Sequence, residues 1–338
     1  MSPSRFSSRL LALLLGGALL SSPVASAQQP LLNAALSLEP MRLATNRSGL
    51  LSVESGAVSQ HLAWDVSVWM GMSSSPLRVR LADGTRGGSL ASNQVGGSVV
   101  ASLGLFGWAQ LGFELPVVAF QQRRLDKEVL TDGLPVLAVG GMGGFRLVPK
   151  VRLLTSARHG VDLAMQAGFN VPTGRNAGFI GDTGTSFRPV LAVPRSFETL
   201  GVASSLGMAI RPELAVSRSF GALRVAGNLG VAVRPTRTLL NHTRQRELSG
   251  QLGAGYRLGT PGGSGLPLEL ALALAGKTGF QRPLARGSED SFELRGMLTY
   301  DLSRSVQLFA GAGRGFSGGW DTPNWRAFGG VRLSTSTN

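Results

Sequence analysis

Residues 266–277 read LPLELALALAGK, and the alternation within this stretch decides the fold. Leucine occupies every second position from Leu266 to Leu274, and the positions between them hold proline, glutamate and alanine. Successive side chains of a β-strand point to opposite faces, so the stretch predicts a strand with one apolar face and one small or polar face. A tilted strand of about ten residues is long enough to cross the hydrocarbon layer of a membrane.

The same alternation recurs along the chain, for example over residues 109–120 and 161–171. The connections between these stretches are alternately short and long along the chain. This pattern is typical of an outer-membrane barrel with periplasmic turns and extracellular loops. The sequence therefore predicts an all-β fold, an antiparallel up-and-down transmembrane β-barrel. Its twelve predicted strands lie near residues 61–73, 94–105, 108–120, 143–155, 160–172, 203–217, 222–234, 247–258, 266–279, 291–302, 305–316 and 325–335.

Fourteen strands are the alternative count, because residues 186–194 (SFRPVLAVP) alternate over a short length of their own. Pro189 and Pro194 count against a strand there, since proline cannot donate to the hydrogen-bond ladder. On either count, the barrel spans residues 61–335 and residues 336–338 form a tail.

The composition fits a barrel and excludes several kinds of site. The 338 residues include 47 Gly and no Cys, and 15% of them are charged. An ordinary soluble domain has about 25% charged residues and about 7% Gly, so the composition disfavours a cytosolic enzyme. The lack of cysteine excludes disulfides, thiolate nucleophiles and cysteine-ligated metal sites.

Residues 1–27 have the layout of a secretory signal peptide. Arg5 and Arg9 precede an apolar run at residues 10–20, and Ala25 and Ala27 form an A-x-A cleavage site. The apolar run is too short to span a bilayer as a helix. We therefore expect export, a fall in net charge to 14 − 2 = +12, and a periplasmic N-terminal segment at residues 28–60 ahead of the barrel.

A secreted antiparallel sandwich is the rival fold, because it also has many short alternating strands. The alternation of short and long connections and the glycines at inward positions favour the barrel. Tryptophan near the strand ends also favours it, because aromatic girdles mark the two membrane interfaces. The five tryptophans that we assign to such girdles are Trp64, Trp69, Trp108, Trp320 and Trp325.

Charged residues fall on the face that would point into the lumen, since a charge on the lipid face costs about 2–4 kcal/mol at the midplane. We expect seven inward acids and eleven inward bases, which favours a pore or cavity with a mild preference for anions. The alternative is that these charges pair with one another and fill the lumen. The candidates for selectivity are Arg146, Lys150, Arg152, Arg211, Arg224, Arg257, Lys277, Glu114, Glu269 and Glu293; the other inward charges are Asp65, Asp162, Glu213, Asp301, Arg234, Arg295, Arg326 and Arg332.

Catalysis finds little support in the sequence. His61, His159 and His242 fall on the first strand, a short turn and a long loop, and a Ser-His hydrolase needs both groups within hydrogen-bond reach. The acids of the loops lack metal-loop spacing, so we expect no metal and no cofactor. The basic loops at residues 121–128 and 234–247 would meet lipopolysaccharide phosphates, and without stacking aromatics they do not indicate nucleic acid.

Three short motifs carry a resemblance to known barrels. Residues 143–154 read GGFRLVPKVRLL, residues 169–174 read FNVPTG and residues 179–182 read FIGD. With them the chain resembles the barrel region of Gram-negative OmpA-family proteins and porin-like transporters, and it is similar to the barrels named for the meta-pathway of phenol degradation. Residues 49–69 resemble the lead-in to the first strand of those barrels. The resemblance implies insertion by the barrel assembly machinery, and we expect no peptidoglycan-binding domain because the chain stops at Asn338.

These observations favour a pore or transporter in the outer membrane for passive passage of small solutes. A structural or adhesive barrel without conductance is the alternative, and a lipid-active barrel enzyme is less favoured. The alternation alone leaves the solute, the oligomeric state and the openness of the lumen undetermined.

Overall fold

The computed structural model describes residues 41–80, 86–125, 139–171, 209–233, 237–239, 242–244, 246–260, 263, 265–281, 283–285, 290–319 and 321–335. The chain divides into two compact units, residues 1–33 and 34–338, and all described residues belong to the second. The expected signal peptide, with Ala25 and Ala27, and the tail at residues 336–338 lie outside the described residues.

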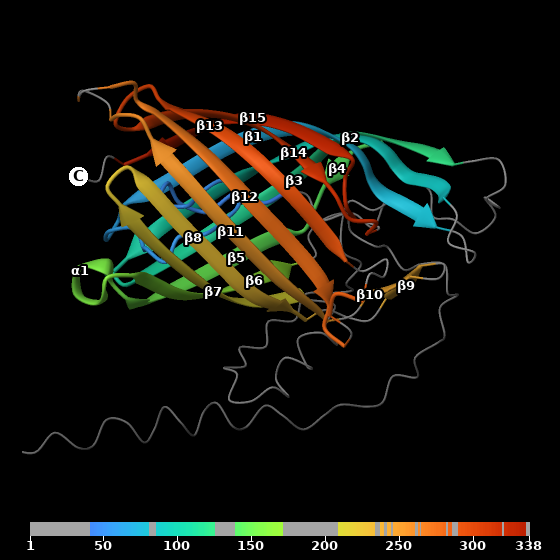
Figure 1. The fold of residues 1–338 in the computed structure, drawn as a ribbon, viewed down its shortest axis with the longest axis horizontal. Coiled ribbons are helices and arrows are strands. Elements are labelled where there is room, and N and C mark those ends of the chain that lie inside the picture. Colours follow the sequence, from blue (N-terminus) through green and yellow to red (C-terminus); the bar gives the residue numbers. More distant parts are fainter. Residues whose placement is uncertain are drawn as a thin grey trace, which may run out of the picture. The chain divides into compact units, whose positions relative to one another are not determined.

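Twelve long strands form most of the described part of the second unit (Figure 1). They are β1 (Trp64–Arg80), β2 (Arg86–Leu105), β3 (Ala109–Leu125), β5 (Phe145–Leu154), β6 (Asp162–Val171), β7 (Ala209–Phe220), β8 (Leu223–Ala232), β11 (Glu247–Arg257), β12 (Leu268–Gly279), β13 (Ser291–Asp301), β14 (Val306–Gly315) and β15 (Trp325–Ser334). The short elements are β4 (Gly141–Met142), which adds to β3, the two-stranded pair β9 (Arg237–Leu239) and β10 (His242–Arg244), and the single-turn helix α1 (Ser156–His159). In the described part of the chain, no helix is long and apolar enough to cross a membrane.

The twelve strands close into a barrel. Each long strand pairs antiparallel with its neighbours along the chain, and β1 pairs with both β2 and β15, so the sheet has no free edge. The prediction of an antiparallel barrel with twelve strands is confirmed. Residues 186–194, on which the count of fourteen rested, lie outside the described residues. We call the end with the short links, α1 and the C terminus the turn end, and the opposite end the loop end (Figure 1).

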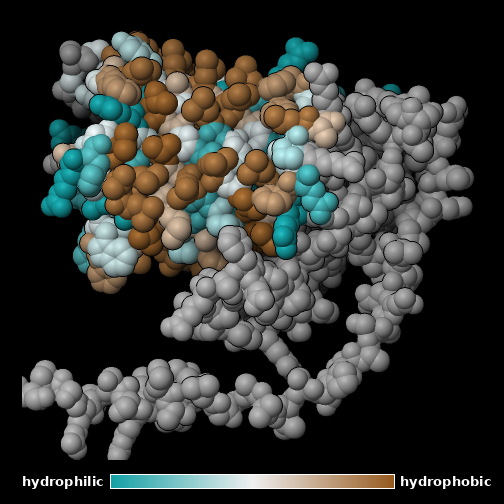
Figure 2. All heavy atoms as spheres, turned by 60° about the horizontal axis from the view of Figure 1, so that its bottom comes forward, coloured by the Kyte–Doolittle hydropathy of each residue, from teal (hydrophilic) through white to brown (hydrophobic). Residues whose placement is uncertain are grey.

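The barrel wall is apolar outside and polar inside. On β12, Leu270, Leu272 and Leu274 are 50%, 61% and 43% exposed, whereas Glu269 between them is 7% exposed. A sandwich would bury the leucines against a second sheet. Because the leucines are exposed and the glutamate is buried, the structure excludes a sandwich. Figure 2 shows the result, with apolar side chains covering the viewed face of the wall and hydrophilic residues gathered at the turn end.

Aromatic side chains mark the strand ends, with one exception. Trp64 and Trp108 are exposed at the turn end, and Trp325 is exposed where β15 begins at the loop end. The assignment of Trp69 to the girdle is wrong, because Trp69 is 5% exposed and points into the lumen. Its indole Nε1–H donates to Oγ of Ser98 at 2.6 Å, so a luminal partner satisfies the donor that lipid would leave unpaired. Trp320 lies outside the described residues.

Residues 41–60, which we call the luminal segment, run inside the barrel. The sequence assigned residues 28–60 to the periplasm, but residues 41–56 lie in the lumen and almost all of them are buried. The segment starts in the loop-end half, where Met41 lies beside Gln94 and Phe328, and it reaches the turn end beside Gly104. Its apolar residues join a buried cluster with wall residues: Met41, Leu43, Leu50, Leu51 and Val53 with Trp69, Ala226, Ala271, Ala273, Phe309 and Phe328.

Glycines on the inner wall make room for the luminal segment. A β-carbon at Gly112 would lie 3.0 Å from Cγ2 of Thr45, and one at Gly253 would lie 3.0 Å from Cγ2 of Val53. At Gly255 the nearest atom of the luminal segment would be Cδ2 of Leu50 at 2.7 Å. These contacts explain part of the high glycine content, since any larger residue at these positions would meet the segment.

Gly253→Val is therefore expected to displace the luminal segment while the wall still closes. Overpacking a well-filled interior costs about 1–3 kcal/mol, so a cysteine introduced at Leu51, which is 2% exposed, should react with a soluble maleimide about tenfold faster or more. Gly227→Val is the matched control, because the atoms nearest to its β-carbon belong to Gln251, Leu252 and Val216 and lie 3.5 Å or more away. Equal labelling rates in the two variants would contradict the close fit.

Candidate functional site

Glu54 links two parts of the luminal segment to each other and to the wall. Its Oε1 accepts a hydrogen bond from the backbone N–H of Thr45 at 2.9 Å, and its Oε2 accepts one from Oγ1 of Thr45 at 3.1 Å. The same Oε2 forms an ion pair with Nζ of Lys150 on β5 at 3.2 Å, and the Lys150 side chain is fully buried. A buried charge is stable only when it is paired and hydrogen-bonded, so Lys150 requires this carboxylate.

Uncharged amides of the wall hold the backbone and side chains of the segment. Asn228 on β8 accepts from the N–H of Glu54 at 2.8 Å and donates to its carbonyl at 2.9 Å. Gln110 on β3 accepts from Nδ2 of Asn46 at 2.8 Å and donates to Oγ1 of Thr45 at 3.0 Å. These paired bonds fix the depth of the segment in the lumen.

Three wall arginines donate to neutral acceptors of the segment. Arg332 on β15 donates to the carbonyls of Ala44 and Asn46 at 3.0 and 3.3 Å. Arg295 on β13 donates to Oγ of Ser52 at 2.7 Å, and Arg224 on β8 donates to the carbonyl of Ser48. Through these contacts the segment accepts hydrogen bonds from the three arginines and brings no negative charge to them.

Other inward charges pair along the wall. Glu114 and Arg146 lie opposite each other on β3 and β5 and form an ion pair at 3.0 Å. Glu293 pairs with Arg295 at 2.8 Å and with Arg326 at 2.5 Å. For these residues the interpretation that inward charges pair within the lumen holds.

The structure places the sequence candidates on or beside the luminal face. Glu114, Arg146, Lys150, Arg211, Glu269 and Glu293 are buried, and Arg152, Arg224, Arg257 and Lys277 are half-buried. Lys277 pairs with Asp321 at 3.1 Å, near the loop end. Arg234 lies outside the described residues.

Sequence reasoning missed the luminal segment and some acids of the wall. Glu247 and Asp290 are buried and Asp321 pairs with Lys277, so the surplus of inward bases is smaller than the alternation predicts. The signal for the segment was present: small inward glycines and inward Gln110 and Asn228 leave a barrel interior to be filled. The alternation does not say which part of the chain fills it.

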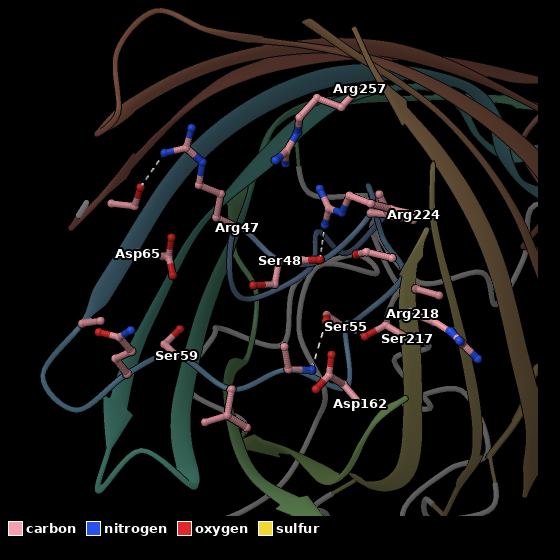
Figure 3. A pocket seen from close by; sticks show the side chains of 18 of the residues that line it. Arg47, Ser48, Ser55, Ser59, Asp65, Asp162, Ser217, Arg218, Arg224 and Arg257 are labelled. Carbon is pink, nitrogen blue, oxygen red and sulfur yellow. Dashed lines mark hydrogen bonds between the residues drawn. The ribbon is translucent and has the colours of Figure 1, made fainter. Parts of the chain in front are cut away.

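A chamber of about 850 Å³ lies at the turn end of the barrel, beside the luminal segment (Figure 3). Five arginines and three aspartates line it: Arg47, Arg218, Arg224, Arg257, Arg304, Asp65, Asp162 and Asp301. Arg47 of the segment pairs with Asp301 at 2.6 Å, and Arg224 and Arg257 both pair with Glu269 beside the chamber, at 2.8 and 3.2 Å. A separate cavity of about 50 Å³ in the loop-end half is lined by Met41, Arg42, Arg211, Lys277, Glu293 and Arg326, among others.

The described histidines lie outside the lumen. His61 is exposed at the turn end and stacks on Phe106, and its Nδ1 accepts from the N–H of Phe106 at 3.1 Å. His159 is exposed in α1. The side chain of His242 lies outside the described part. Among the described residues, no three His, Asp or Glu side chains are grouped so that they could hold a metal ion.

Solved structures with the same architecture include outer-membrane proteins. An outer-membrane channel from Pseudomonas putida F1 aligns over 82% of this chain and 97% of its own length, with 14% identity and a TM-score of 0.51. The NanC porin (79% and 98% covered, 9% identity, TM-score 0.46) and the CymD monoaromatic hydrocarbon channel (83% and 90% covered, 12% identity, TM-score 0.41) are more distant. No protein-family model and no curated protein sequence matches the chain. The chain has the fold of an outer-membrane β-barrel with twelve strands, and its own residues 41–60 occupy the lumen.

Proposed function

We propose that the protein is an outer-membrane channel for small solutes, and that the luminal segment closes it in the conformation described above. The luminal segment is the observation behind this proposal. It crosses the lumen and is not one of the barrel strands, whereas the wall closes through hydrogen bonds among its own strands. A part that is bound to the wall mainly by side chains can leave without breaking the barrel. The apolar exterior and the aromatic ends support placement in a membrane.

An anion preference is part of the proposal. With the segment in place, the turn-end chamber is lined by five arginines and three aspartates. Without the segment, Lys150 loses its carboxylate and Arg332 loses two carbonyl acceptors, whereas Asp301 loses Arg47. Lys150 and Arg332 then lie in the lumen without these partners, and bases along a pore attract anions, so the opened barrel should favour them.

The channel is tested by planar-bilayer recording of refolded protein, with and without residues 41–60. Discrete conductance steps from the shortened chain support the channel. The absence of steps from both proteins would refute it.

Charge selectivity gives a separate prediction. In the shortened chain, neutralising Arg146, Lys150 and Arg152 together is expected to move the reversal potential in a salt gradient toward cation preference, because three inward positive charges are removed. Arg314→Gln is the control, since Arg314 is exposed on β14. An unchanged reversal potential in the triple variant would contradict the assignment of these bases to selectivity.

A structural or adhesive barrel without conductance is the second candidate. The dense bonding of Glu54 favours it, because a permanently bound segment would leave no passage. Steps from neither protein in the bilayer experiment would support this candidate.

The lipid-active enzyme is tested by incubating the refolded protein with phospholipid, and release of fatty acid would support it. Lipopolysaccharide and the assembly machinery remain predicted partners.

A further inference from the structure

We propose that the turn-end chamber contains a binding site for a small oxyanion, such as a phosphate or a carboxylate, between Arg224 and Arg257, and that its occupation loosens the luminal segment. The site lies at the chamber wall near Ser48 of the segment (Figure 3). The loosening deepens the proposed channel function and rests on it, whereas the binding itself does not require conduction.

The two arginines come from neighbouring strands and share one carboxylate. Arg224 lies opposite Gly255 on β11, and Arg257 lies two residues further along that strand, opposite Glu269 on β12. Nη1 of Arg224 lies 3.0 and 2.8 Å from the two oxygens of Glu269, and Nη2 of Arg257 lies 3.2 Å from one of them. Two guanidinium groups against one carboxylate leave one positive charge uncompensated.

Gly255 makes this arrangement possible. A β-carbon there would lie 2.6 Å from Oε1 of Glu269, so glycine leaves the space in which the carboxylate of β12 reaches across β11 to Arg224 on β8. The wall is therefore shaped to gather both arginines at one point.

Arg257 has unused donor capacity. Of its five N–H donors, one bonds Glu269, and the others, including the buried Nε–H, have no acceptor among the described residues. Its side chain is 35% exposed and lines the chamber, whose volume of about 850 Å³ exceeds that of a phosphate ion. Guanidinium groups bind phosphate and carboxylate oxygens through paired, charge-assisted hydrogen bonds, which identifies the class of ligand.

Arg224 links this site to the luminal segment. Its Nη2 donates to the carbonyl of Ser48, in the turn where the N–H of Gly49 donates to the carbonyl of Asn46 at 3.2 Å. An oxyanion competes with that carbonyl for the same donor and is the stronger acceptor because it is charged. Binding should therefore release the turn-end half of the segment.

The binding test is calorimetric titration of the full refolded chain with inorganic phosphate, against sodium chloride of equal ionic strength. We expect one site, and Arg257→Gln should weaken binding about tenfold or more because charge-assisted hydrogen bonds are lost. Arg304→Gln is the control: it removes the same charge from the chamber lining but lies outside the site, and it should bind phosphate as the unmodified chain does. Absence of binding, or an equal loss in both variants, would overturn the site. Acetate and a phosphate monoester in place of phosphate distinguish a carboxylate ligand from a phosphate ligand.

The coupling test uses the cysteine at Leu51 as a reporter. Saturating phosphate should raise its maleimide labelling rate several-fold, and the Arg257→Gln variant should lose this effect. Binding without any change in labelling would overturn the coupling and leave the site. If phosphate binds but the shortened chain never conducts, the channel function fails and the site stands; if the shortened chain conducts but phosphate does not bind, only this inference fails.

Discussion

Deleting residues 41–60 is expected to convert a barrel that is closed most of the time into one with long-lived conductance steps. The physical reason is that these residues occupy the lumen between the turn-end chamber and the loop-end cavity, with Val53 at 0% and Leu51 at 2% exposure. The wall should survive the deletion because its ring of twelve strands closes through β1, β2 and β15 without the segment. Planar-bilayer recording of the refolded proteins measures the effect.

A reversible tether is the matched control for this deletion. A β-carbon at Gly253 would lie 3.5 Å from that of Val53, within the range of about 3.5–4.5 Å found in disulfides. The double variant Val53→Cys and Gly253→Cys contains no other thiol, since the chain has no cysteine. It should stay closed when oxidised and recover the behaviour of the parent chain after reduction. Long-lived steps from the oxidised protein would show that the ions take another path.

Glu54→Leu is expected to release the luminal segment by leaving Lys150 buried without its carboxylate. Removing one member of a buried ion pair costs about 3–5 kcal/mol, so the labelling rate of the cysteine at Leu51 should rise about 100-fold or more. The Lys150 side chain is fully buried and pairs with Glu54 at 3.2 Å, so the penalty is not screened by water.

The double variant Glu54→Leu and Lys150→Met separates a charge effect from a packing effect. Replacing both members of a buried pair with apolar residues is often close to neutral, so this variant should label much more slowly than Glu54→Leu alone. Glu114→Leu is the second control, because it breaks the wall pair with Arg146, and the hydrogen-bond partners of Glu114 among the described residues are wall residues. A fast rate in the double variant would mean that the segment stays in place because its internal hydrogen bonds between Glu54 and Thr45 keep its shape, and not because Lys150 is neutralised.

The sequence predicts the ends of most wall strands to within a few residues. Residues 291–302 were predicted as a strand, and β13 runs from Ser291 to Asp301. The largest difference is at the loop end, where β2 begins at Arg86 and not at residue 94, because β1 and β2 continue their pairing through irregular register beyond Ser74. The inward positions of Glu114, Lys150 and Glu269 followed from the same alternation.

The alternation of the strands does not predict which residues fill the lumen. The sequence assigns Trp69 to the interfacial aromatic girdle because tryptophan is common there, but its indole N–H donates to Ser98 inside the barrel. Residues 41–60 lack the strict alternation of a strand, and nothing in their own pattern shows that a barrel surrounds them.

The sequence by itself determined the alternating strands and which side chains share the inner face, because a strand's alternation is a local property of neighbouring residues. It left twelve and fourteen strands open, and the pairing of β1 with β15 in the structure gives the closed ring of twelve. Only the tertiary structure decided that the lumen is occupied and which inward charges pair with one another. The deciding contacts join residues far apart in the chain, such as Glu54 with Lys150, 96 positions away, and Arg47 with Asp301, 254 positions away. Such pairs depend on how the closed ring brings distant side chains together, and no local pattern encodes that.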